Sequence, residues 1–166
     1  ITAVATGMVM ASLLFMKEMV DLQLQNINTI TDPDRTETPL SADEKAIMKA
    51  AKGDILLYHL AGPMSFGAAK EMSRRLAQFD HYRALVLDLS DVPRVDYTSS
   101  RAIDDMIYDA QSTGRQVFLV GGRPQVYHML EKQGVLDRLE NGHRHNDRLN
   151  ALRHAANNIN SNNQST

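Results

Sequence analysis

The chain has 166 residues, which is enough for one compact domain with short appendages and too few for a multidomain enzyme. Its 18 basic and 20 acidic side chains nearly balance, so the chain lacks a strong positive field and we predict no nucleic-acid partner. The sequence contains no Cys, which excludes disulfides, thiol nucleophiles and Cys-ligated metal sites.

Residues 1–16 are the first distinctive segment, because they include no charged residue and no proline. As a helix they would extend about 24 Å, less than a hydrocarbon core about 30 Å thick. Since no initiator Met precedes Ile1, we interpret them as the end of a transmembrane helix. The small residues Ala3, Gly7 and Ala11 lie four apart, a spacing that favours close helix packing in membranes. A buried helix of a soluble fold is the alternative.

The next segment connects this helix to the rest of the chain. Lys17 follows the apolar run directly and, by the positive-inside rule, places what comes after it on the cytoplasmic side. We interpret residues 17–40 as a helix extension and a linker, because they include the polar, twice Pro-interrupted run DPDRTETP. Ser41 and Glu44 then have the spacing of a capping box, which predicts that a short helix begins there.

Residues 41–140 alternate between strand and helix patterns. Apolar runs that are typical of buried strands occur at 55–60, 84–89 and 116–120. Apolar residues at helical spacing predict helices over 69–79, after Asp96 and from Pro124. Because strands separated by helices need crossover connections, we predict an α/β domain, with a small sheet and helices packed on it.

The helix after Asp96 has a clear amphipathic pattern. Its inward residues are predicted to be Ile103, Met106, Ile107 and Ala110. We expect Asp104, Asp105 and Asp109 to point outward and to form a solvated acidic edge.

Residues 141–166 form a polar, Asn-rich segment with few apolar side chains. Such a segment buries too little apolar surface to offset its ordering entropy, so we predict a largely disordered tail with at most a helix over 147–156. His143, His145 and Asp147 are metal-ligand types, but they lie in this tail and we predict no metal site.

A cluster of hydroxyl residues begins the helix after Asp96, namely Thr98, Ser99 and Ser100. A helix N-terminus has unpaired amides and a partial positive charge, so it can stabilise a phosphate placed on a hydroxyl. Simple capping of the amides by Asp and Ser is the alternative interpretation.

Two motifs resemble a known family. The strand that ends in Asp-Leu-Ser and continues through VPRVDYTSS resembles the signature loop of STAS domains, the fold shared by sulfate transporters and anti-sigma-factor antagonists. The segment GPMSF at 62–66 resembles the Gly-Pro-Leu-x-Phe turn of the transporter branch. Both motifs occur in the right order within about residues 53–140. The resemblance implies the STAS fold, in which the small sheet is mixed and helices pack on it.

The resemblance carries over to single residues of the loop. In the antagonist branch the loop reads Asp-Ser-Ser-Gly, and a partner kinase phosphorylates the second Ser. Asp96 matches the Asp and Thr98 matches the phosphorylated position, whereas Tyr97 and Ser99 depart from the pattern. The resemblance therefore implies a candidate switch loop that consists of Asp96, Thr98, Ser99 and Ser100, with no catalytic residue and no cofactor.

An apolar helix followed by a STAS-like domain is similar to the end of a SulP-family transporter. This resemblance implies a regulatory and dimerisation domain on the cytoplasmic side of the cell inner membrane, in a secondary carrier of bicarbonate with sodium, or of sulfate. The implied partners are the carrier's own membrane domain, a second copy of the chain and a regulatory protein. The alternatives are a soluble phospho-switch protein of the anti-sigma-factor antagonist type and a small nucleotide-binding or enzymatic α/β domain.

Overall fold

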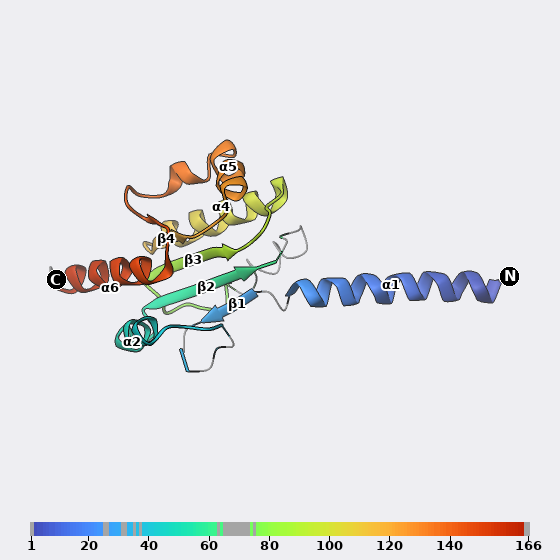
Figure 1. Ribbon diagram of the computed structural model, residues 1–166, viewed down its shortest axis with the longest axis horizontal. Coiled ribbons are helices and arrows are strands. Elements are labelled where there is room, and N and C mark those ends of the chain that lie inside the picture. The colour runs from blue at the N-terminus through green and yellow to red at the C-terminus, as the bar shows by residue number, and fades with distance from the viewer. Residues whose placement is uncertain are drawn as a thin grey trace.

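The described part of the chain is built around a five-stranded sheet (Figure 1). The computed structural model describes residues 2–24, 27–30, 33–34, 36, 38–62, 64, 74 and 76–164. In the sheet the strands follow chain order: β1 (Ile27–Ile30), β2 (Ile55–Ala61), β3 (Ala84–Asp91), β4 (Gln116–Val120) and β5 (Arg144–His145). β1 is antiparallel to β2, whereas β2 to β5 run parallel, which confirms the predicted mixed sheet.

The three predicted strands are the three central ones. β2 and β3 each contain six consecutive buried residues, because helices cover both faces of the sheet. β1 and β5 lie at the two edges of the sheet and were not predicted. They have four and two residues, which is too short to show the alternation that identifies a strand.

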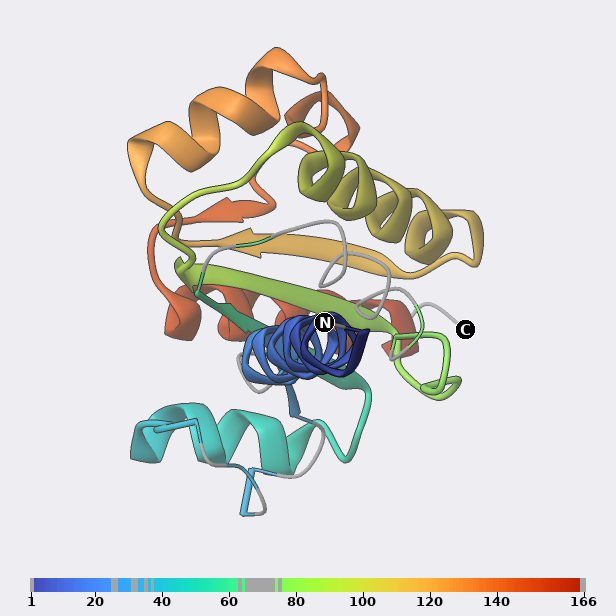
Figure 2. The same cartoon turned by 90° about the vertical axis from the view of Figure 1, so that its right-hand side faces the viewer.

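Each face of the sheet has its own helices (Figure 2). The α4 face is covered by α4 (Tyr97–Ser112), α5 (Pro124–Lys132) and the short helix η1 (Leu136–Arg138). The α6 face is covered by α2 (Ala42–Ala50) and α6 (Arg148–Gln164). Because side chains alternate along a strand, Leu56 and Tyr58 pack on the α4 face, whereas Leu57 packs on the α6 face.

The capping box at the start of α2 is present as predicted. The Ser41 hydroxyl accepts a hydrogen bond from the Glu44 amide at 3.2 Å, and the Ser41 amide donates to the Glu44 carboxylate at 2.6 Å. These bonds satisfy two amides that the helix itself leaves unpaired. The helix therefore begins where the sequence pattern placed it.

The inward face of α4 is also as predicted, but one residue of the acidic edge is not. Ile103, Met106 and Ile107 are buried in the α4 face, whereas Asp105 is exposed. Asp104 was predicted to be solvated, and it is only 4% exposed. It lies beside the buried stripe, where η1 packs over it, and its carboxylate accepts hydrogen bonds from Arg138 and Arg101.

The prediction of a largely disordered tail was wrong. The C-terminal segment forms α6, which continues through position 164. Ala151, Leu152, Ala155 and Ile159 recur at helical spacing and are buried against the sheet. Although these apolar residues are few, they stabilise the helix because the sheet supplies a surface on which they pack. The predicted domain limits of 41–140 were consequently too narrow at both ends, since β1 and α6 belong to the same fold.

The predicted helix over 69–79 lies mostly outside the described residues. At its end Leu76 is buried in the α4 face. Met64 forms a bridge to Val95, and both side chains are buried on the α4 face.

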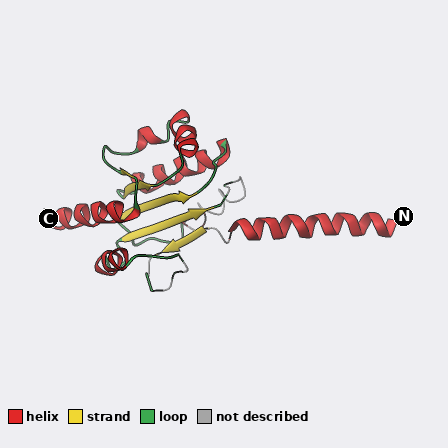
Figure 3. Ribbon diagram, in the orientation of Figure 1, coloured by secondary structure: helices red, strands yellow, loops and turns green. Residues whose placement is uncertain are grey.

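The N-terminal helix α1 (Thr2–Leu24) extends away from the sheet (Figures 1 and 3). Eight of its large apolar side chains are between 60% and 70% exposed, namely Val4, Met8, Val9, Met10, Leu13, Leu14, Phe15 and Met16. None of the helices in the described ranges combines the length and hydropathy that crossing a membrane requires.

Candidate functional site

The candidate switch loop lies at the carboxyl edge of the sheet, between β3 and α4. Val92 and Val95 are buried and hold the loop on the α4 face. Asp96 follows in an extended conformation, and its carboxylate accepts a hydrogen bond from the Ser99 amide at 2.7 Å. Asp96 is therefore the N-cap of α4, which is the simpler of the two roles considered from the sequence.

The predicted hydroxyl cluster occupies the first turn of α4, but its members differ in accessibility. Ser99 and Ser100 are fully buried, and the Ser100 hydroxyl donates to the Tyr97 carbonyl oxygen at 2.8 Å. The Ser99 hydroxyl has no hydrogen-bond partner within the described part of the chain. Thr98 is half-buried, so it is the most accessible residue of this cluster.

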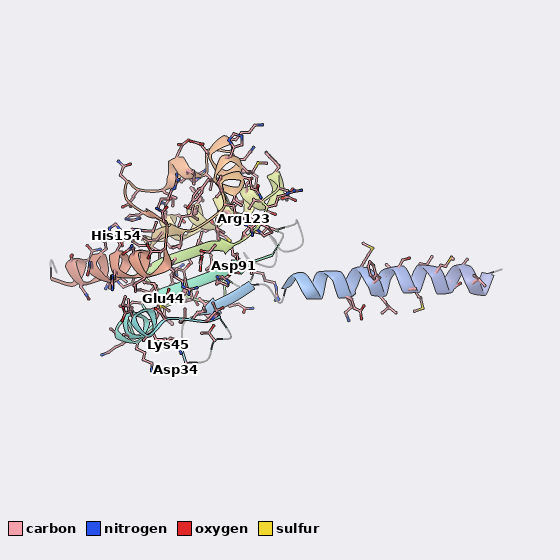
Figure 4. The ribbon with its side chains drawn as sticks, in the orientation of Figure 1. Asp34, Glu44, Lys45, Asp91, Arg123 and His154 are labelled. Carbon is pink, nitrogen blue, oxygen red and sulfur yellow. The ribbon has the colours of Figure 1, made fainter. Side chains whose placement is uncertain are left out.

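The turn after β4 lies at the same edge of the sheet. Gly121 has φ of +62°, and a Cβ there would lie 2.9 Å from Ser90 Cα, so the close approach of β3 requires glycine. The Gln125 side chain donates to the Pro93 carbonyl oxygen at 2.5 Å and ties α5 to the candidate switch loop. Asp91 and Arg123 are exposed along this edge, near the end of the sheet from which α1 departs (Figure 4).

A second polar cluster lies inside the α6 face and was not predicted. Asp88 is only 1% exposed, and one of its oxygens accepts hydrogen bonds from the Ser90 amide at 3.0 Å and the Ser90 hydroxyl at 2.6 Å. Its other oxygen lies 3.0 Å from His59 Nδ1 on the neighbouring strand. The Ser90 hydroxyl bonds to Asp88 and not to the imidazole, so these groups lack the nucleophile-to-base geometry of a hydrolase.

Arg148 connects this cluster to α2. Its guanidinium donates to both oxygens of Glu44, at 2.7 and 3.2 Å, and to Asp88 at 3.1 Å. It also donates to the Pro39 carbonyl oxygen at 2.9 Å. One side chain from the start of α6 thus joins α2, β3 and the segment before α2. We call His59, Asp88, Glu44 and Arg148 the buried charge network.

The electrostatics of this network follow from burial and hydrogen bonding. Burial would raise the pKa of Asp88, but the hydrogen bonds from His59 and Ser90 outweigh it and lower the pKa to about 2. Burial opposes ionisation of Glu44 as well, yet the hydrogen bonds from Arg148 and Ser41 lower its pKa below the usual value. Both carboxylates are therefore ionised at neutral pH.

The sequence pattern of the strands could have predicted part of this network. His59 and Asp88 are polar residues inside two apolar strand runs, and they are paired in register in the sheet. The role of Arg148 could not be predicted from the sequence, because this residue lies in a segment whose composition indicated disorder.

The histidines of the predicted tail are part of the fold. His143 is buried and His145 half-buried, whereas Asp147 is exposed. Throughout the described ranges, no group of three or more His, Asp or Glu side chains is arranged to hold a metal ion.

The family model of the STAS domain matches residues 46–148. The chain belongs to the STAS domain family. This match confirms the resemblance of the signature loop and the predicted fold.

Two relatives and one solved structure show the extent of the similarity. The chain is 37% identical over 155 residues to the bicarbonate transporter BicA of a Synechocystis species, which covers 93% of this chain and 27% of the relative. It is 34% identical over 139 residues to BicA of a Picosynechococcus species, which covers 84% of this chain and 24% of the relative. The STAS domain of a SulP transporter from Vibrio cholerae superposes with a TM-score of 0.62 at 23% identity, over 73% of this chain and 99% of that one.

The chain therefore spans about a quarter of the length of these two relatives. Both relatives are named as transporters and not as enzymes. The similarity to the Vibrio cholerae structure supports the fold.

Proposed function

We propose that the chain is the cytoplasmic C-terminal part of a membrane anion transporter, with α1 as the end of its last membrane helix. The observation that supports this most is the extent of the match to BicA. The match leaves about 11 of the 166 residues uncovered, so it includes at least about half of the 23 residues of α1. The likeness therefore extends beyond the STAS domain into the apolar helix.

The surface of α1 supports the same proposal. Its exposed apolar residues include Met8, Val9 and Met10, which are consecutive and therefore point in different directions around the helix. A helix that is apolar around its circumference needs an apolar environment on every side. Lipid and neighbouring membrane helices provide that environment, and a helix suits it because its backbone groups hydrogen-bond to one another within the segment.

The orientation of the sheet determines which edge of the domain lies next to α1. Ile27 at the start of β1 pairs with Leu60 near the carboxyl end of β2, so α1 joins the domain at the carboxyl edge of the sheet. With α1 in the membrane, this edge and the candidate switch loop face the membrane domain. Contacts at this edge that differ between transport states would then bias the transport equilibrium, which is how the domain would regulate transport.

Thr98 is the residue at which this regulation is most readily tested. It lies in the first turn of α4 and is half-buried, next to the Asp96 cap. A phosphate there would add about two negative charges at the edge that faces the membrane domain. We therefore propose that a regulatory protein or kinase acts at Thr98, and that Ser99 and Ser100 have a structural role.

The transported substrate is proposed from the named relatives. Both are bicarbonate transporters, so sodium-coupled uptake of bicarbonate is the first candidate and sulfate is the second.

We also propose that two copies of the domain associate. The carrier moves its substrate unchanged, so the domain needs no catalytic residue and no cofactor.

Liposome flotation tests the membrane part of the proposal. The 166-residue chain should float with vesicles, and a double variant Leu13→Glu/Leu14→Glu should stay in the soluble fraction, because it places two charges in the hydrocarbon region. Tyr108→Glu, at an exposed residue of α4, is the matched control and should float as the wild type does. A wild-type chain that stays soluble would support a soluble phospho-switch protein instead.

Uptake measurements test the substrate. The gene product that contains this chain, reconstituted in vesicles, should accumulate labelled bicarbonate only with an inward sodium gradient. Competition by sulfate at similar concentration would make sulfate the better candidate. Thr98→Glu should change the uptake rate, whereas Thr113→Glu, at an exposed residue beyond the far end of α4, should not.

A further inference from the structure

Three imidazole rings gather where β5 meets α6. His143 stacks on Phe118 with 4.2 Å between ring centroids, and His154 meets the same ring edge-on at 5.1 Å. His145 Nε2 lies 3.2 Å from His154 Nδ1, a hydrogen bond that joins β5 to α6. His154 is labelled on α6 in Figure 4.

This hydrogen bond depends on the protonation state of both rings. It forms only when one of the two facing nitrogens has a hydrogen and the other has a free lone pair. If both rings become protonated, two N–H groups and two positive charges face each other at the same short distance. His143 does not replace either partner, because its Nδ1 donates to the Val117 carbonyl oxygen at 2.9 Å.

The surrounding charges do little to neutralise the pair. Burial lowers the pKa of His145, and the His154 and His143 rings lower it further, whereas the Asp147 carboxylate acts in the opposite direction. Glu140 lies 3.5 Å from His143 and is otherwise exposed. The neighbouring cations face elsewhere, since Arg144 stacks on an aromatic ring of α5 and the guanidiniums of Arg148 and Arg153 face α2.

We propose that the His145–His154 pair is a proton-sensitive latch, which holds α6 on the sheet at neutral pH and loosens it in mildly acidic solution. The direction follows from linkage. Because the pKa of His145 is lower in the folded chain than in the unfolded chain, the stabilisation is complete above about pH 6.5 and is lost as the pH falls below that value. Loosening α6 would expose the apolar residues Leu152 and Ile159.

Hydrogen exchange of the 166-residue chain in detergent micelles tests this latch. Protection factors, each relative to the unfolded chain at the same pH, are compared at pH 7.5 and 5.5. The amides of α6 should lose protection at pH 5.5, by at most about tenfold because this pH lies one unit below the unfolded pKa of His, while those of α4 keep theirs. His145→Gln, which places an amide near the position of Nε2, should remove the pH effect. His128→Gln, at an exposed residue of α5, should retain it.

Three results would overturn the proposal: equal α6 protection at both pH values, the same loss in the wild type and in His145→Gln, or an equal loss in α4. A ring-proton NMR titration provides a second measurement. In His154→Asn the His145 signals should titrate at higher pH than in the wild type, because the opposing charge is gone. An unchanged midpoint would also refute the latch. The wild-type measurements suffice if either variant fails to fold.

Discussion

The two faces of the sheet use the same strands but are stabilised in different ways. On the α4 face the buried side chains of β2, β3 and β4 are mostly hydrocarbon, such as Leu56, Leu85 and Leu87. On the α6 face the same strands also contribute His59 and Asp88, which are buried beside apolar neighbours. Apolar contacts have no preferred direction, whereas ion pairs and hydrogen bonds do.

The difference shows how a helix with few apolar residues is positioned. α6 buries Ala151, Leu152, Ala155 and Ile159 against the sheet, and such apolar contact has no preferred direction. The hydrogen bonds from Arg148 to Glu44 and Asp88, in contrast, require a particular placement of the helix. We infer that the buried charge network selects the position of α6, while the apolar residues supply most of its affinity for the sheet.

The largest expected effect is the loss of Arg148. Arg148→Met leaves Asp88 and Glu44 buried without their cation, so we expect it to lower the free energy of unfolding by about 3–5 kcal/mol. Urea unfolding followed by circular dichroism measures this change. The control is Arg153→Met, whose pair with Asp43 is exposed and should cost less than about 1 kcal/mol. Equal effects of the two variants would contradict the comparison of the two faces.

A cavity on the α4 face should have a slightly smaller effect. Leu87 is fully buried in the centre of β3, so Leu87→Ala should lower the free energy of unfolding by about 2–5 kcal/mol. The same urea titration measures it. Leu87→Ala and Arg148→Met should act additively, because they lie on opposite faces of the sheet. A coupling of more than about 1 kcal/mol would mean that the faces are not independent.

Acid should weaken the α6 face first. The pKa of Asp88 is lowered to about 2, so the stability that it contributes is complete above its unfolded value near 3.8 and is lost as the pH falls from there toward 2. The free energy of unfolding measured at pH 2 should therefore be about 2 kcal/mol lower than at pH 5 because of this group. Asp88→Asn should show a flatter dependence over this range. A variant curve parallel to the wild type would place the acid sensitivity elsewhere.

The smallest of these effects concerns the start of α2. Ser41→Ala removes the hydroxyl that accepts from the Glu44 amide, so it should lower the free energy of unfolding by about 1 kcal/mol. Ser41→Asp keeps an acceptor at the cap and should restore most of the loss. A loss much larger than 1 kcal/mol would indicate that the cap also positions Glu44 for Arg148.

Local patterns along the chain determined most of the fold. Continuous apolar runs identified β2, β3 and β4, since strands covered on both faces need no polar alternation. The pair Ser41 and Glu44 determined the start of α2, and the signature loop with Asp96 determined the family. These features depend on residues that lie close together in the chain, where spacing and capping chemistry act directly.

Contacts between segments that are distant in the sequence determined the remaining features of the fold. Local sequence patterns do not reveal such contacts. Arg148 lies 60 residues from Asp88 and 104 from Glu44, so its role exists only after the sheet and both helices have assembled. The same holds for Asp104, which η1 covers, and for α6, whose few apolar residues become sufficient only against a preformed surface. Burial and pairing depend on which surfaces meet, and that is a property of the tertiary structure alone.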